Sequence, residues 1–118
     1  MINQNSTFPY NNPNDLPELS FTAGNSQELS FTVYDSGSSL VDLSGATMSW
    51  YLARWGTATS VLTKAGTYSG SGVFVVDLPG ANTLTLDGKY VQQYKITTTS
   101  GSTYRPSQGI VNITRALA

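Results

Sequence analysis

The chain has 118 residues, a formal net charge of −1, and neither cysteine nor histidine. Its length fits one domain with one core, and its charged fraction of 11% is well below the roughly 25% of typical soluble domains. The dispersed basic residues form no phosphate-binding footprint, which excludes nucleic-acid binding, and the missing Cys and His exclude disulfides, thiolate metal sites and Ser-His-Asp or Cys-His catalysis.

The first residues lack the basic and apolar segments of a signal peptide, and no apolar run approaches the length of a membrane span. We therefore expect a protein made without a signal peptide and without membrane contact.

Residues 1–17 are predicted to form an extended arm rather than a regular element. The segment contains five asparagines and three prolines, and its apolar residues follow neither a helical nor a strand period. Phe8 and Tyr10 are its only aromatic residues, and we name both as candidates for a protein interface. We expect the arm to pack on a neighbouring subunit or on its own domain, which comprises residues 18–118.

Alternating apolar residues predict a series of short strands from residue 19 onward. Residues 60–63 are expected to form a short edge strand, followed by a Gly/Ser-rich loop at residues 64–72. Pro106 is expected to interrupt the last strand, since proline cannot donate to a sheet ladder. The remaining strands are expected near residues 19–21, 29–33, 48–52, 73–78, 89–98 and 104–113. About seven strands without a helical period predict an all-β Greek-key sandwich.

Two aromatic residues are assigned structural roles. Trp50 lies mid-strand on the apolar phase and is the best candidate for a central core tryptophan. Tyr90 follows the Asp87-Gly88 turn at the start of the penultimate strand. A tyrosine at that place in immunoglobulin-like sandwiches hydrogen-bonds to the chain just upstream, so Tyr90 is predicted to lock the crossover between the two sheets.

No residues are assigned to catalysis, cofactor binding or metal binding. The seven acidic residues lie almost all at strand ends or turns, where aspartate is common for turn reasons alone. Calcium is conceivable through Asp35, Asp42 or Asp87, but the dense ligand loop that calcium sites use does not appear. We therefore expect no enzyme activity and no cofactor.

Three further aromatic residues are candidates for a binding surface: Tyr51, Trp55 and Tyr68. Tyr51 has the phase opposite to Trp50 and should face outward. Exposed tyrosine and tryptophan are enriched in protein interfaces, which is the favoured interpretation. The alternative is a carbohydrate-binding module, if several of these rings lie on one sheet face.

Several segments resemble the immunoglobulin-like N-terminal domain of phage baseplate upper proteins and related virion domains. The resemblance covers residues 19–113. It begins with Phe21-Thr22-Ala23-Gly24 leading into Leu29-Ser30-Phe31-Thr32-Val33, and continues through Leu86-Asp87-Gly88-Lys89-Tyr90. Its most specific part is Asp42-Leu43-Ser44-Gly45 before an alternating strand.

This resemblance implies a non-enzymatic virion protein that attaches to other structural proteins, located in the phage particle after synthesis in the host cytoplasm. Baseplate upper proteins usually continue into further domains, whereas the sequence here extends only a few residues past its last expected strand. A capsid decoration or cement protein is therefore a nearly equal alternative to a tail or baseplate component. The partners expected are the major capsid protein or tail and baseplate proteins, with this chain present as a homo-oligomer or in many copies. The N-terminal arm is the expected assembly contact.

Overall fold

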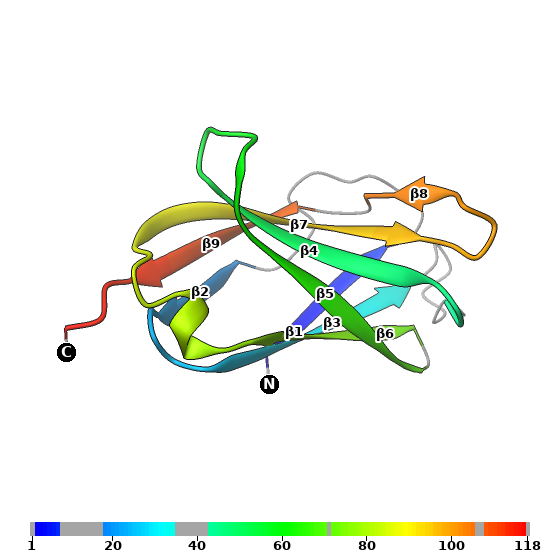
Figure 1. The fold of residues 1–118 in the computed structure, drawn as a ribbon, viewed down its shortest axis with the longest axis horizontal. Coiled ribbons are helices and arrows are strands. Elements are labelled where there is room, and N and C mark those ends of the chain that lie inside the picture. The colour runs from blue at the N-terminus through cyan, green and yellow to red at the C-terminus, as the bar shows by residue number, and fades with distance from the viewer. Residues whose placement is uncertain (1, 8–17, 35–42, 71, 106–107, 118) are drawn as a thin grey trace.

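The structure is a computed structural model that describes residues 2–7 (backbone only), 18–34, 43–70, 72–105 and 108–117. Strands make up most of these residues, together with one turn of 3-10 helix, η1, at Gly80–Asn82 (Figure 1). The strands are β1 Ile2–Thr7, β2 Leu19–Thr22, β3 Gln27–Tyr34, β4 Thr47–Arg54, β5 Ser60–Gly70, β6 Val73–Leu78, β7 Gly88–Thr97, β8 Thr103–Tyr104 and β9 Gln108–Thr114. The expectation of an all-β sandwich is confirmed.

The strands form one continuous hydrogen-bonded sheet that curls into two facing layers. The order is β1-β3-β6-β5-β4-β7-β9-β2, and β8 pairs with β7 beside β9. β5 pairs with β4 through its first half and with β6 through its second, so this one long strand carries the sheet from one layer to the other (Figure 1). The pairing register shifts in both ladders of β5, and such shifts increase local bend and twist.

The core lies between the layers and is built from the inward phase of each strand. β4 and β7 show the alternation most clearly, with every second residue buried over most of their length. Trp50 is fully buried at the centre. The rings of Phe31 on β3 and Tyr94 on β7 meet across the layers with centroids 5.1 Å apart, within the range of favourable aromatic pairs. Leu43, just before β4, is buried at the margin of this core.

The prediction for residues 60–72 was wrong. Ser60–Gly70 is a single 11-residue strand in the middle of the sheet, not a short edge strand followed by a loop. Its inward phase carries Lys64 and Gly66, which hid the alternation from the sequence pattern. Gly66 is needed for close packing, because a Cβ there would come within 2.6 Å of Met48 Sδ. A strand glycine often marks such a close approach.

The prediction that the N-terminal arm contains no regular element was wrong for Ile2–Thr7, which form a strand. The backbone of Ile2–Thr7 pairs in parallel with β3, which places β1 at one end of the strand order. Phe8 and Tyr10 lie outside the described residues, and the boundary between arm and domain at residues 17 and 18 stays a prediction. At the other end of the chain, the expected interruption of the last strand falls between β8 and β9.

Tyr90 is fully buried, and its hydroxyl accepts a 3.2 Å hydrogen bond from the backbone N–H of Asp87. The Asp87 carboxylate in turn pairs with Arg115 at 3.1 Å. The turn before β7 is therefore attached both to the core and to the chain that follows β9.

Candidate binding cleft

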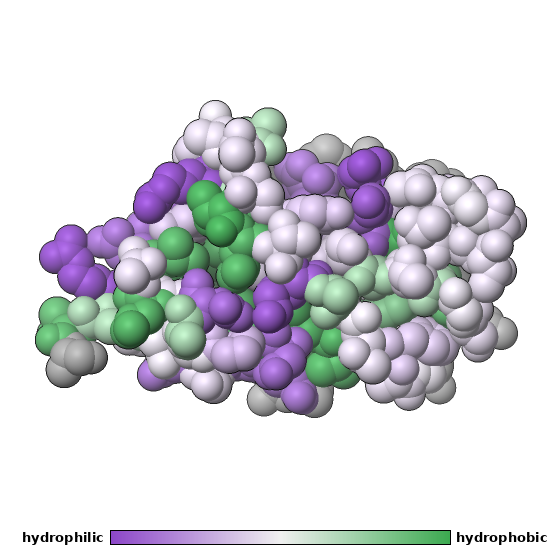
Figure 2. Space-filling model, in the orientation of Figure 1, coloured by the Kyte–Doolittle hydropathy of each residue, from purple (hydrophilic) through white to green (hydrophobic). Residues whose placement is uncertain are grey.

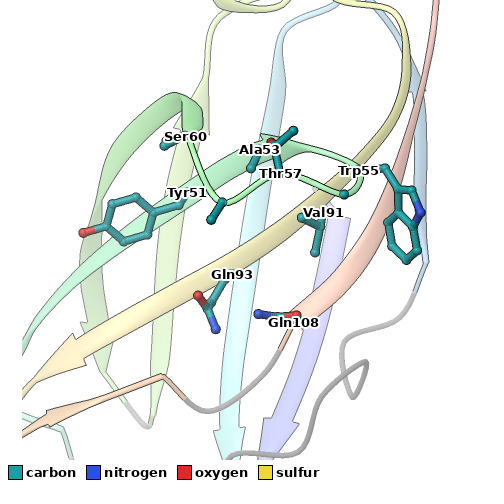
Figure 3. Close-up of a pocket in the computed structure, with 10 residues that line it drawn as sticks. Tyr51, Ala53, Trp55, Thr57, Ser60, Val91, Gln93 and Gln108 are labelled. Atoms are coloured by element: carbon teal, nitrogen blue, oxygen red, sulfur yellow. The ribbon is translucent and has the colours of Figure 1, made fainter.

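An open cleft with a volume of about 600 Å³ lies on the outer face of the layer formed by β4, β7 and β9. The strand registers explain its floor. Tyr51 is paired with Gln93 and Gln93 with Gln108, so the three side chains form one row across the sheet. Ala53 and Val91 form the adjacent row. Tyr51 and Trp55 lie at opposite ends of the labelled group, with the two glutamines between them (Figure 3).

The turn between β4 and β5 forms one wall of the cleft and projects beyond the body of the sheet (Figure 1). The carbonyl of Arg54 accepts hydrogen bonds from both the backbone N–H and the hydroxyl of Thr57, at 3.0 and 2.9 Å. Gly56 has φ 82°, in the left-handed region that favours glycine. The backbone N–H of Trp55 donates to the carbonyl of Lys89 at 3.1 Å, so the base of this turn is tied to β7.

Two lysines lie over the aromatic rings at the ends of the cleft. Lys89 Nζ is 4.0 Å from the ring centroid of Trp55, and Lys95 Nζ is 5.8 Å from that of Tyr51. Both distances fall within the range of cation–π attraction. The ten lining residues are uncharged. The charges beside the two aromatic rings are therefore those of the Lys89 and Lys95 ammonium groups, and they are positive.

The sequence candidates separate into different environments. Tyr51 and Trp55 line the cleft. Tyr68 instead packs against the core, with its ring centroid 5.0 Å from that of Phe74. Its hydroxyl accepts hydrogen bonds from the backbone N–H groups of Leu43 and Gly72, each at 3.2 Å. Tyr68 therefore does not share a face with the other two, and it fastens two loops to β5.

Sequence reasoning did not single out Gln93, Gln108 or Val91 as site residues. Gln93 and Val91 have the outward phase of β7, which the alternation indicated. A glutamine on a solvent-exposed strand face does not by itself indicate a binding site. Gln108 joins them only through the pairing of β7 with β9. Only this register, which follows the irregular connection after β7, identifies the row.

No group of three or more His, Cys, Asp or Glu side chains that could hold a metal ion occurs among the described residues. The same part of the chain contains no helix long and apolar enough to cross a bilayer. On the face shown in Figure 2, residues of intermediate hydropathy predominate, and hydrophilic and hydrophobic residues are interspersed among them.

Comparison with solved structures gives a match over nearly the whole chain. The N-terminal domain of phage TP901-1 ORF48 superposes with a TM-score of 0.66, covering 97% of this chain and 98% of that one at 9% sequence identity. The shared fold is that of a phage protein domain. The expected resemblance to an N-terminal phage domain is thus confirmed at the level of fold.

The CopC protein from Methylosinus trichosporium OB3b is also similar, with a TM-score of 0.47 and 10% identity over 86% of this chain and 87% of that one. No protein-family model matches the sequence, and no curated protein matches it significantly.

Proposed function

We propose that this chain is a non-enzymatic structural protein of a bacteriophage particle, which acts by binding other virion proteins. The observation that carries the proposal is the fold match to the N-terminal domain of phage TP901-1 ORF48. It extends over 97% of this chain and 98% of the other, so the similarity involves an entire domain rather than a fragment of a common sandwich. A buried core without assigned catalytic or metal-binding residues suits a structural role.

The tail or baseplate is the favoured location. The sequence segments quoted above resemble the N-terminal domain of baseplate upper proteins, and the fold match is to an N-terminal phage domain as well. A decoration or cement role on the capsid is the alternative, because a small sandwich with an extended arm could also lie across capsomers.

Residues 1–17 are the proposed assembly contact. β1 is paired with β3 on one side and ends the strand order, so among the described strands its other backbone edge has no sheet partner. An edge of this kind can accept a strand from another chain. The partner would be a tail or baseplate protein, or a second copy of this chain in a multi-copy assembly.

Separation of capsids from tails in particles of the phage that encodes the chain tests the proposal, with detection by immunoblotting. We expect the protein in the tail fraction at a fixed number of copies per particle. Detection only in the capsid fraction would contradict the tail location while leaving the virion role intact. Absence from purified particles would contradict both.

A further inference from the structure

We propose that the cleft between Tyr51 and Trp55 binds a short anionic oligosaccharide, a function beyond attachment to other virion proteins. The volume of about 600 Å³ lies within the range of ligand-binding clefts. Tyr51 lies in β4 and Trp55 at the first position of the turn after it, and four residue steps of strand backbone correspond to about 13 Å. The cleft is therefore longer than a single sugar ring and open to an oligomer.

The two aromatic rings provide flat apolar surfaces for sugar rings. Trp55 is 50% exposed, so a large part of its indole surface is accessible to a ligand. Its backbone is tied to β7 through the hydrogen bond to Lys89, so the indole extends from a fixed point. Tyr51 is half-buried in the row next to Gln93. Aromatic side chains combine a large apolar face with little conformational freedom to lose on binding.

The floor between the rings can recognise hydroxyl groups. Among the described residues, neither Gln93 nor Gln108 makes a side-chain hydrogen bond, and each amide offers two donors and an acceptor. Sugar hydroxyls are both donors and acceptors, so these paired amides match them. The hydroxyls of Thr57 and Ser60 donate instead to backbone carbonyls, which assigns them to the wall of the cleft.

The charge favours an anionic sugar. Lys89 and Lys95 lie beside the two aromatic rings. Of the described acidic side chains near these strands, Glu18 accepts a 2.9 Å hydrogen bond from Asn112, the register partner of Lys89, and Asp87 is paired with Arg115 at 3.1 Å. Cation–π contacts at exposed sites are weak. A carboxylate or phosphate on the ligand can therefore draw each ammonium from the aromatic face, which a sugar ring then covers.

The position of the cleft on a sheet face argues against an extended polypeptide as its ligand. β4 is paired with β5 and β7, β7 with β4 and β9, and β9 with β7 and β2. Strand addition uses unpaired backbone groups at a sheet edge. β4 and β7, which carry most of the cleft floor, have neighbours on both sides, and β9 is paired with β2 from Val111 to Thr114. Recognition over β4 and β7 must therefore come from side chains, and those present are aromatic rings, amides and ammonium groups.

An array of oligosaccharides, with uronic-acid, sialic-acid and phosphate-containing members beside neutral analogues of the same backbone, tests the proposal on the full-length protein. We expect saturable binding to acidic members and weaker binding to their neutral analogues. The Trp55→Ala variant should weaken binding by about tenfold or more, given the loss of one stacking surface. Lys89→Gln and Lys95→Gln should each weaken the binding of acidic oligosaccharides and reduce the salt dependence of that binding.

Leu84→Ala and Lys64→Gln are the controls, since they alter an apolar and a cationic residue that neither line the cleft nor lie over its aromatic rings, and they should leave the affinity unchanged. In NMR titration of the wild-type protein with the tightest-binding array member, the Gln93 and Gln108 side-chain amides should shift. Absence of any binder on the array, or affinity unchanged by Trp55→Ala, would overturn the proposal. Capture of a virion protein by a photo-crosslinker at position 55 in intact particles would overturn it in favour of protein docking. These sugar-binding results are independent of the particle-fractionation test, so failure of this proposal and failure of the proposed virion role can be told apart.

Discussion

The indole nitrogen of Trp50 donates a 2.8 Å hydrogen bond to the side-chain oxygen of Gln92, and both side chains are fully buried. The two residues lie on β4 and β7, which are neighbouring strands, and Gln92 is directly opposite Leu52. A buried amide is tolerated when its polar atoms are paired. This bond is compatible with the observed register of β4 against β7, the same register that places the row of cleft side chains on the opposite face.

Gln92→Leu should destabilise the domain by about 1–3 kcal/mol, because the buried indole N–H of Trp50 would lose its acceptor. Gln93→Leu is the matched control on the same strand, with its side chain on the outer face, and should change stability by less than about 0.5 kcal/mol. Urea unfolding followed by tryptophan fluorescence measures both. Equal losses for the two variants would show that the buried bond contributes nothing specific.

Tyr68→Phe should release two loops without removing the aromatic packing on Phe74. The variant lacks the hydroxyl that accepts the backbone N–H groups of Leu43 and Gly72. Each hydrogen bond contributes about 1 kcal/mol to stability, so amide hydrogen exchange at Leu43 and Gly72 should accelerate several-fold when the bonds are lost. Amides within β4, such as that of Leu52, should change little and serve as the internal reference. Unchanged exchange at both loop positions would show that the hydroxyl does not hold them.

Gly80→Ala should be among the most destabilising single-methyl additions in the domain. A Cβ at this position would come within 2.1 Å of the backbone carbonyl oxygen of Gly24, so the β2–β3 turn would have to move. We expect a cost of about 2 kcal/mol or more, in the range of overpacking.

Gly66→Ala provides the comparison for this substitution. The added methyl group at residue 66 meets Met48 Sδ at 2.6 Å, but a thioether side chain can change rotamer, so the cost should be smaller. Thermal unfolding of the two variants decides the order. A larger loss for Gly66→Ala would show that the β2–β3 turn yields more readily than the core methionine.

Tyr90→Phe should cost about 1 kcal/mol, since the backbone N–H of Asp87 would lose its hydroxyl acceptor. Tyr51→Phe, on the outer face, should have no measurable effect on stability. Arg115→Ala should change stability by less than about 1 kcal/mol, because the Arg115 side chain in the ion pair with Asp87 is 76% exposed. Denaturant midpoints for the three variants should therefore separate Tyr90→Phe from the other two.

The sequence predicted the strands in which apolar residues alternate without interruption, such as β3, β4 and β7. It failed for β5, because Lys64 and Gly66 occupy the inward phase and only the proximity of Met48 explains a glycine there. It also gave no strand at Ile2–Thr7, whose mostly polar residues acquire their extended pairing from β3. A non-local contact, rather than local pattern, decides both cases.

The candidate site was predictable only in part. The outward phase of Tyr51 followed from its alternation with Trp50, and Trp55 was among the aromatic residues named as candidates for a binding surface. Tyr68 could not be separated from them, because its inward phase depends on β5 being a continuous strand. The meeting of Gln93 with Gln108 depends on the register between β7 and β9, which strand periodicity alone does not specify.

Deletion of residues 1–17 should abolish incorporation into particles while leaving the domain folded. The buried core of the described residues begins at Leu19, so the truncated chain keeps all of it and loses only the pairing of β1 with β3. Far-UV circular dichroism should remain of the β type, and the melting temperature should fall modestly. Incorporation is measured by quantitative immunoblotting of purified particles.

A second variant separates the role of β1 pairing from the presence of the segment. Prolines at two consecutive positions, Asn3→Pro and Gln4→Pro, remove one backbone donor on each side of β1, so pairing with β3 is disrupted while the rest of the arm is retained. If ordered β1 forms part of the assembly contact, this variant should also incorporate poorly. Wild-type occupancy of the full deletion would show that assembly uses another surface, whereas wild-type occupancy of the proline variant alone would assign the contact to residues that do not depend on β1.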